Sequence, residues 1–160
     1  MPVIRRSALV FCLLAVFFLI ATSALAGRVL RQATSQEVYV PVYSHVYQGI
    51  KGRPYNLSAL LSIRNVDHAQ SITVTSVQYY NDHGKMMKEY VSEPVTIGPM
   101  VTYEVHIPER DQQGGSGANF TVKWTSTQKV NIPIIQAVMI GTASTQGISF
   151  VCDGVVIEED

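Results

Sequence analysis

Alternation between apolar and polar positions runs through most of the chain after residue 37. In residues 38–47 the valines at even-numbered positions fall on one face of an extended strand. The opposite face carries Tyr39, Tyr43, His45 and Tyr47. Pro41 cannot donate a hydrogen bond to a neighbouring strand, so we expect an edge strand or a strand broken by a bulge.

The same alternation predicts further strands at residues 59–64, 72–80, 86–91, 101–107, 118–124, 132–142 and 148–152. In the first of these, Ala59, Leu61 and Ile63 share a face, and Leu60 breaks the pattern on the other face. Residues 82–84 (Asp-His-Gly) indicate a hairpin turn, and residues 49–54 form a basic loop. No segment after residue 26 has helical periodicity. The pattern predicts an all-β fold, an antiparallel immunoglobulin-like β-sandwich of about seven to nine strands with Trp124 in its core.

The first 26 residues have the pattern of a secretory signal peptide. Arg5 and Arg6 precede an apolar run, which ends in Ala-x-Ala at residues 24–26. We expect a signal helix that is cleaved after Ala26, and therefore a periplasmic or secreted protein. The alternative is a retained membrane anchor formed by residues 8–26, although an anchor usually needs about 20 apolar residues.

Removal of residues 1–26 leaves 160 − 26 = 134 residues, the length of one ordinary domain. We expect a linker at residues 27–36, a single domain at 37–157 and an acidic tail at 158–160. Loss of two arginines gives a net charge of 10 − 12 = −2. No cluster of cationic residues remains, so the composition argues against nucleic-acid binding and strong binding to anionic membranes. Membrane contact is then expected only transiently, through the signal peptide.

Cys152 is the single cysteine that follows the signal segment. An exported chain with one cysteine buries it, keeps it as a reactive thiol or forms a dimer through it. The apolar residues before it favour a half-buried structural cysteine at a strand end.

Four blocks of sequence resemble one protein family. They are residues 38–47 (VYVPVYSHVY), 61–65 (LSIRN), 114–124 (GGSGANFTVKW) and 137–150 (AVMIGTASTQGISF). The family consists of bacterial exported or lipid-anchored proteins. It is known only as a domain of unknown function, with the number three-one-two-four. The resemblance covers nearly all of residues 36–152 and implies an envelope location and one whole domain, but no activity. Residues 82–84 and 97–99 are loosely similar to bacterial immunoglobulin-like modules.

The glycine-rich segment at residues 114–118 is close to the Gly-x-Ser-x-Gly motif of serine hydrolases. That motif needs a turn from a strand into a helix, whereas a predicted strand follows here. We interpret the segment as a flexible loop. Its backbone N–H groups are an alternative anion-binding nest. The residues of that candidate site are Arg110, Gly114, Gly115, Ser116 and Gly117.

The histidines lack the spacing of a zinc site. They are His45, His68, His83 and His106. His83 with Met86 and Met87 is an alternative copper site, because imidazole and thioether ligands suit Cu(I). We predict no cofactor and assign no catalytic residue.

The tyrosine face of residues 38–47 is the strongest candidate for a binding surface, because tyrosines provide large amphipathic contact area. The alternative is that this face packs under the loop at residues 108–117 or against the second sheet. We therefore expect a non-enzymatic binding module for an envelope protein or glycan. The alternative function is a periplasmic metal-binding protein with His, Met and Cys ligands.

Overall fold

A computed structural model describes residues 31–142 and 147–160 of the chain. The expected signal helix, its cleavage site and the alternative anchor at residues 8–26 lie outside the described residues. Within the described residues every regular element is a β-strand, and every strand pair is antiparallel. The all-β prediction is therefore confirmed. In this part of the chain, no helix has the length and apolar character needed to cross a membrane.

The described residues form twelve strands. They are β1 (Gln32–Pro41), β2 (His45–Gln48), β3 (Arg53–Asn56), β4 (Ser58–Arg64), β5 (Ile72–Tyr80), β6 (Met86–Glu89), β7 (Val95–Ile97), β8 (Thr102–Ile107), β9 (Asn119–Asn131), β10 (Ile134–Gly141), β11 (Ile148–Asp153) and β12 (Val155–Glu159). Strands β3, β7 and β12 were not predicted, because β3 and β7 are only four and three residues long and β12 is exposed at every position.

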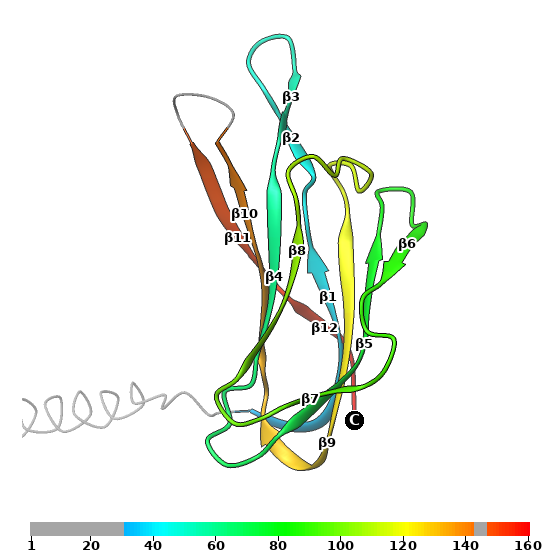
Figure 1. The fold of residues 1–160 in the computed structure, drawn as a ribbon, viewed down its shortest axis with the longest axis vertical. Coiled ribbons are helices and arrows are strands. Elements are labelled where there is room, and N and C mark those ends of the chain that lie inside the picture. The colour runs from blue at the N-terminus through cyan, green and yellow to red at the C-terminus, as the bar shows by residue number, and fades with distance from the viewer. Residues whose placement is uncertain (1–30, 143–146) are drawn as a thin grey trace, which may run out of the picture. The chain divides into compact units, whose positions relative to one another are not determined.

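The strands form two large sheets and a hairpin (Figure 1). The six-stranded sheet has the order β12-β1-β9-β5-β6, and β7 also pairs with β5. The four-stranded sheet has the order β11-β10-β4-β8. Strands β2 and β3 pair only with each other, and we call residues 45–56, which contain them, the arm.

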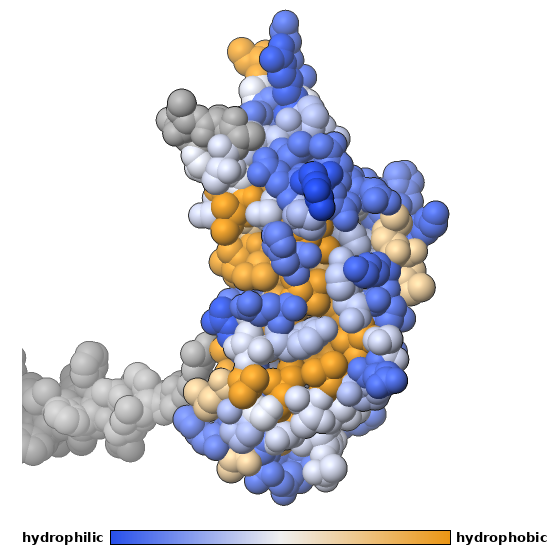
Figure 2. Space-filling model, in the orientation of Figure 1, coloured by the Kyte–Doolittle hydropathy of each residue, from blue (hydrophilic) through white to orange (hydrophobic). Residues whose placement is uncertain are grey.

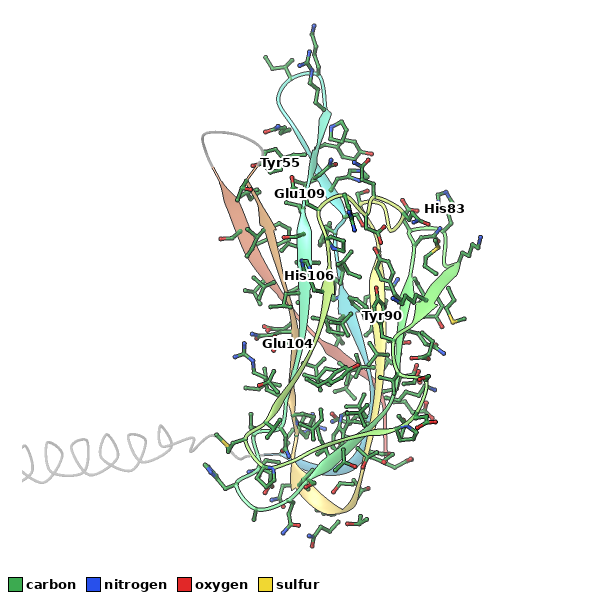
Figure 3. All side chains as sticks on the ribbon, in the orientation of Figure 1. Tyr55, His83, Tyr90, Glu104, His106 and Glu109 are labelled. Carbon is green, nitrogen blue, oxygen red and sulfur yellow. The ribbon has the colours of Figure 1, made fainter. Side chains whose placement is uncertain are left out.

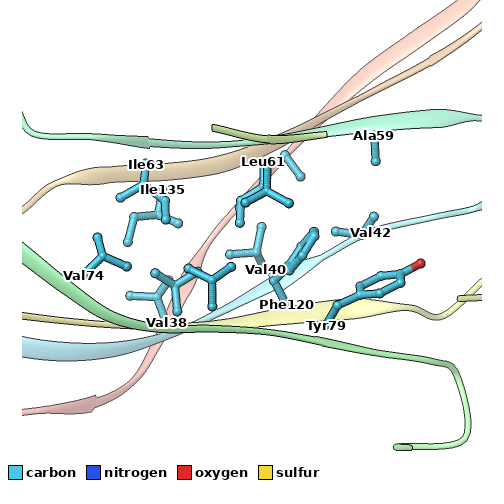
Figure 4. Close-up of a cluster of buried hydrophobic side chains, with 14 of the residues drawn as sticks. Val38, Val40, Val42, Ala59, Leu61, Ile63, Val74, Tyr79, Phe120 and Ile135 are labelled. Carbon is cyan, nitrogen blue, oxygen red and sulfur yellow. The ribbon is translucent and has the colours of Figure 1, made fainter. Parts of the chain in front are cut away.

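The core lies between the two large sheets (Figure 4). Val40 of β1 and Phe120 of β9 meet Leu61 and Ile63 of β4 there, and all four are fully buried. Trp124 is also fully buried, as the alternation in β9 predicted. The strand predicted at residues 101–107 begins one residue later, at Thr102, and Val101 is 50% exposed.

Strand β1 is not at an edge, because it lies between β12 and β9. Pro41 fits there because β12 pairs with β1 only as far as Tyr39, so no strand on that side needs the missing N–H. The chain leaves β1 after Pro41 and resumes as β2 at His45. The edge prediction was wrong. The strand is broken after Pro41, but by a bend at Ser44 and not by the bulge that the alternative expected.

Two predicted boundaries were also wrong. Residues 32–36 of the expected linker belong to β1 and pair with β9. Glu158 and Glu159 of the expected tail belong to β12. Arg31 Nη2 lies 2.7 Å from Glu159 Oε1, so an ion pair joins the two ends of the described chain. The compact unit accordingly runs from residue 31 to residue 160.

Asn65 joins the β4–β5 loop to the β7–β8 connection at one end of the sheets. Its side-chain amide Nδ2 donates to the carbonyl oxygens of Gln70, Ile97 and Gly98 at 2.8, 3.2 and 3.0 Å. Its Oδ1 accepts the N–H of Asp67 at 3.0 Å. Asn65 is only 1% exposed, so these bonds replace water that it cannot reach.

Asp67 extends this network to the β9–β10 turn. Its carboxylate accepts backbone N–H groups from Asn131, Ala69 and Gln70 at 3.0, 2.9 and 2.9 Å. These bonds favour the charged form and lower the pKa of the carboxyl group, with the bond from Asn131 as the largest cause.

Glu89 completes the hydrogen bonding of β5 where β6 ends. Its carboxylate accepts hydrogen bonds from the Ser76 hydroxyl and the N–H of Val77, both at 2.7 Å, and from the N–H of Val91 at 3.2 Å. Burial alone would raise the pKa of Glu89, but these bonds outweigh it, and the pKa is lowered.

Candidate interaction surface

An apolar row crosses the outer face of the four-stranded sheet. The strand registers place Leu60 of β4 beside Val138 of β10, and Val138 beside Val151 of β11. Leu60 and Val138 are half-exposed, and Val151 is 53% exposed. Figure 2 shows hydrophobic surface over β4 and β10 between polar groups. Leu60, which broke the sequence alternation, is thus part of an outward-facing apolar row.

Strands β11 and β12 are edge strands of different sheets, although they follow each other directly (Figure 1). The chain changes sheets at Gly154, whose N–H donates to the carbonyl of Ile135 at 2.8 Å. A Cβ atom at Gly154 would lie 2.5 Å from Val38 Cγ1, so the crossing leaves no room for a side chain. One continuous segment therefore forms an edge of each sheet.

Natural proteins protect edge strands with lysines, prolines or bulges. Strand β12 has such protection, because its pairing with β1 shifts register at Ile157 and it ends in acidic residues. Strand β11 has a regular register from Ile148 to Asp153 and contains no lysine, arginine or proline. Within the described residues, no strand pairs with its outer edge. This edge, next to the apolar row, is open to another strand.

The predicted tyrosine face does not form one surface. Tyr39 is half-buried on the outer face of the six-stranded sheet, between Val155 and Thr121. Tyr43 packs edge-on against Phe150 of β11, with ring centroids 5.6 Å apart, and contributes to the core margin.

The other two predicted residues lie on the arm. His45 and Tyr47 of β2 meet in a T-shaped contact, with ring centroids 5.2 Å apart. Tyr47 is 64% exposed. The bend between Val42 and Ser44 separates these side chains from Tyr39, so strict alternation did not keep them together.

The glycine-rich loop joins two distant parts of the chain. The carbonyl of Gly115 accepts the N–H of Ser44 at 2.9 Å, and the carbonyl of Gly114 accepts the N–H of Asp82 at 3.0 Å. Gly115 has a φ of 77°, which favours glycine. Strand β9 follows the loop directly, so Ser116 lies before a strand and not in a nucleophile elbow.

The environment of this loop disfavours a bound anion. The Asp82 carboxylate lies directly against Gly115, and Gly117 also lies beside Asp82. Arg110 is exposed, and no ion pair is seen for it among the described residues. The predicted anion-site residues share one loop, but the nearest charge to the glycines is negative.

The predicted metal ligands lie on separate elements, as Figure 3 shows for His83 and His106. His45 is on β2, His83 in the β5–β6 turn, His106 on β8 and Cys152 on β11. Within residues 31–142 and 147–160, no group of three or more His, Cys, Asp or Glu side chains could hold a metal ion.

The nearest neighbours of His83 and Cys152 are protein groups that belong to the fold. His83 Nδ1 lies 2.6 Å from Asp82 Oδ1, and Met86 is 50% exposed. Cys152 is half-buried against the core, opposite Ala137, and burial raises the pKa of its thiol. These environments provide no support for the alternative of a metal-binding protein.

A small cavity of about 120 Å³ lies between β6 and the loop at residues 108–117. It is lined by Tyr79, Met87, Lys88, Tyr90, Asp111 and Gln113. Lys88 Nζ lies 4.3 Å from the centre of the Tyr90 ring (labelled in Figure 3). Another cavity, beside Glu37 and Lys123, measures about 190 Å³. Both are smaller than the roughly 300–1,000 Å³ of typical small-molecule sites.

The fold defines an all-β domain of two antiparallel sheets around a common core, with an open edge at β11. The chain belongs to the family described as "Protein of unknown function (DUF3124)", whose model matches residues 35–157. This confirms the family resemblance of the four sequence blocks.

The chain is also similar to a solved structure, described as "Crystal Structure of Thermotoga maritima 1070", with 12% sequence identity and a TM-score of 0.46. That similarity covers 78% of this chain and 97% of the other. No curated protein matches this chain.

Proposed function

We propose that this protein is a non-enzymatic, immunoglobulin-like β-sandwich module, exported to the bacterial cell envelope, which binds a protein partner by strand addition to β11. The observation that carries the proposal is the unprotected edge of β11 beside the apolar row of Leu60, Val138 and Val151. Strand addition uses main-chain hydrogen bonds for affinity and alternate side chains for specificity. The signal-peptide pattern at the N-terminus supports export.

The edge also defines the chemistry of the partner. An added strand pairs with the outer backbone groups of β11 and places every second side chain beside the outer face. On that face Val151 lies between Ser149 and Asp153. The fitting partner is an extended segment with an apolar residue opposite Val151 and polar residues two positions away on each side.

A protein fits the observed surfaces better than a glycan does. Glycan binding by stacking needs several aromatic rings on one surface, and the tyrosines of residues 38–47 are divided among three locations. An extended protein segment instead uses an edge and an apolar row, both of which are continuous here.

The test places a photocrosslinking amino acid at position 151 in the native bacterial host. The matched control places it at position 106, because His106 lies in the same row on the opposite edge strand, β8, which carries the exposed charge of Glu104 in the middle of its outward face and is followed by Pro108. We expect a specific adduct with one protein from position 151 and none from position 106. Equal adducts from both positions, or none from position 151, would contradict the proposal.

A substitution then tests the edge directly. Val151→Lys adds a charge of the kind that protects natural edges, and Val155→Lys is the control on β12, where Val155 is 58% exposed. We expect copurification of the crosslinked partner to be lost in the Val151 variant and kept in the Val155 variant. Thermal unfolding monitored by circular dichroism checks that both variants fold.

A further inference from the structure

The tip of the arm presents a fully exposed isoleucine beside two exposed cationic side chains. Residues 49–52 connect β2 to β3, and Gly49 and Gly52 take positive φ values of 67° and 56°. The N–H of Gly52 donates to the carbonyl of Gly49 at 3.1 Å and closes the turn. Ile50 and Lys51 are therefore held outward at the end of a hydrogen-bonded hairpin, which extends beyond the neighbouring strands (Figure 1).

Ile50 is the most exposed large hydrophobic residue of the described chain, at 108% of its reference area. Tyr47 on the same arm is 64% exposed. Figure 2 shows one small hydrophobic patch at the end of the arm, directly beside hydrophilic residues. An apolar side chain at the end of a projecting hairpin can enter an apolar layer before any other part of the domain makes contact.

The charged side chains of the arm have one sign. Lys51 and Arg53 are both exposed, and Arg53 pairs in register with the uncharged Gln48. Between Glu37 and Asp67 the sequence contains no carboxylate side chain. The acidic C-terminal residues lie at the other end of the domain (marked C in Figure 1).

We infer that the arm tip binds the surface of a bilayer that contains anionic phospholipids, with Ile50 inserted among the lipids and Lys51 and Arg53 on the headgroups. Interfacial binding of proteins combines buried apolar area with attraction of cationic side chains to anionic lipids. The overall composition argued against such binding because the net charge averages over the whole chain, whereas the fold holds two exposed cations, Lys51 and Arg53, beside an exposed isoleucine at the end of the arm. This inference goes beyond strand addition, because the arm and β11 are different surfaces.

The test is flotation of the purified protein with vesicles. One set consists of phosphatidylcholine alone, and the other of phosphatidylcholine and phosphatidylglycerol in equal amounts. We expect binding to the anionic vesicles, weakened by salt, and little binding to the neutral ones. No binding to the anionic vesicles, or equal binding to both sets, would overturn the inference.

Variants of the tip separate its two components. We expect the double variant Lys51→Gln, Arg53→Gln to bind at least about tenfold more weakly, and Ile50→Ser to bind several times more weakly. The matched controls are Lys85→Gln with Lys129→Gln, which removes two exposed cations elsewhere, and Ile157→Ser, which removes an isoleucine that is 57% exposed on β12.

The controls and Val151→Lys should bind as the wild type does, which separates this inference from the proposed strand addition. If the control pair weakens binding as much as the tip pair, the attraction belongs to the overall charge and the inference fails. If Ile50→Ser binds as the wild type does, no insertion takes place, and the inference also fails.

Discussion

The hydroxyl group of Tyr79 lies 3.1 Å from Oγ of Ser44, so a buried hydrogen bond connects β5 to the segment between β1 and β2. A Cβ atom at Gly114 would collide with the Tyr79 hydroxyl and lie 2.6 Å from Ser44 Oγ. The loop at residues 108–117 therefore closes directly over this hydrogen bond. The glycine at position 114 serves close packing.

Tyr79→Phe should destabilise the fold by about 1–2 kcal/mol, because it removes this bond and leaves the buried Ser44 hydroxyl without that partner. The midpoint of urea unfolding measures the change. Tyr80→Phe is the matched control, since the Tyr80 hydroxyl bonds to Gln78 at 2.6 Å in a half-buried setting that water can reach. Equal losses of stability in the two variants would contradict the role of the Ser44 bond.

Gly141→Ala should destabilise the protein by about 1–3 kcal/mol through overpacking. A Cβ atom there would collide with the ring of Tyr55 and lie 2.7 Å from Leu57 Cδ2. Gly147→Ala is the control on the neighbouring strand end, because its Cβ would meet a single atom at an ordinary 3.6 Å. Calorimetric unfolding should show a lower Tm for the first variant only, and an unchanged Tm there would disprove the close contact.

Asn65→Ala should cost about 3 kcal/mol, because three carbonyl groups and one N–H lose a buried partner together. Asn131→Ala keeps the backbone N–H that serves Asp67 and removes only a 3.3 Å surface bond from Gln32. Its cost should stay under about 1 kcal/mol. Urea unfolding compares the two variants, and similar costs would show that Asn65 does not act as a junction.

Glu89 should make the unfolding free energy depend on pH in the acidic range. Its pKa is lower in the folded chain than its ordinary value of 4.5. The unfolded chain therefore binds more protons in that range, and stability decreases as the pH falls through it. The stabilisation is complete above the ordinary value and is lost as the pH falls through the folded pKa.

Glu89→Gln removes this titration while keeping the shape of the side chain. The difference in unfolding free energy between wild type and variant should be largest at neutral pH and narrow below pH 4.5. Denaturant unfolding at a series of pH values measures it. Asp67 keeps its own acid dependence in both proteins, because its pKa is lowered independently. A difference that stays constant with pH would contradict the assignment to Glu89.

Alternation in the sequence predicted the inward faces correctly where strands are long and lie over the core. Phe120, Val122 and Trp124 of β9 are all fully buried, since each side-chain direction repeats every two residues. Sequence could not identify which strands are edges, because that depends on pairing between distant segments. Pro41 indicated an edge strand or a bulge, whereas β1 lies inside the sheet and β12 pairs with it only as far as Tyr39.

The candidate surface was predictable only in fragments. Leu60 stood out as a break in the alternation, but Val138 and Val151 become its neighbours only through the strand registers. The tyrosines do alternate along an extended chain, but the bend near Ser44 sends those before and after it to different surfaces. The basic loop was visible in sequence, but its position at the end of an arm was not.

Strand β1 has no neighbour in the sheet that is near it in sequence. Its partners are β9, which begins at Asn119, and β12, which begins at Val155. A chain that emerges from its N-terminal side must therefore keep Val38 and Val40 unpaired until most of the remaining sequence has followed. Contacts of such long range slow folding, and an unpaired apolar strand is prone to aggregation during the delay. The order of the strands thus predicts that the first strand of the domain is the last to find both of its partners.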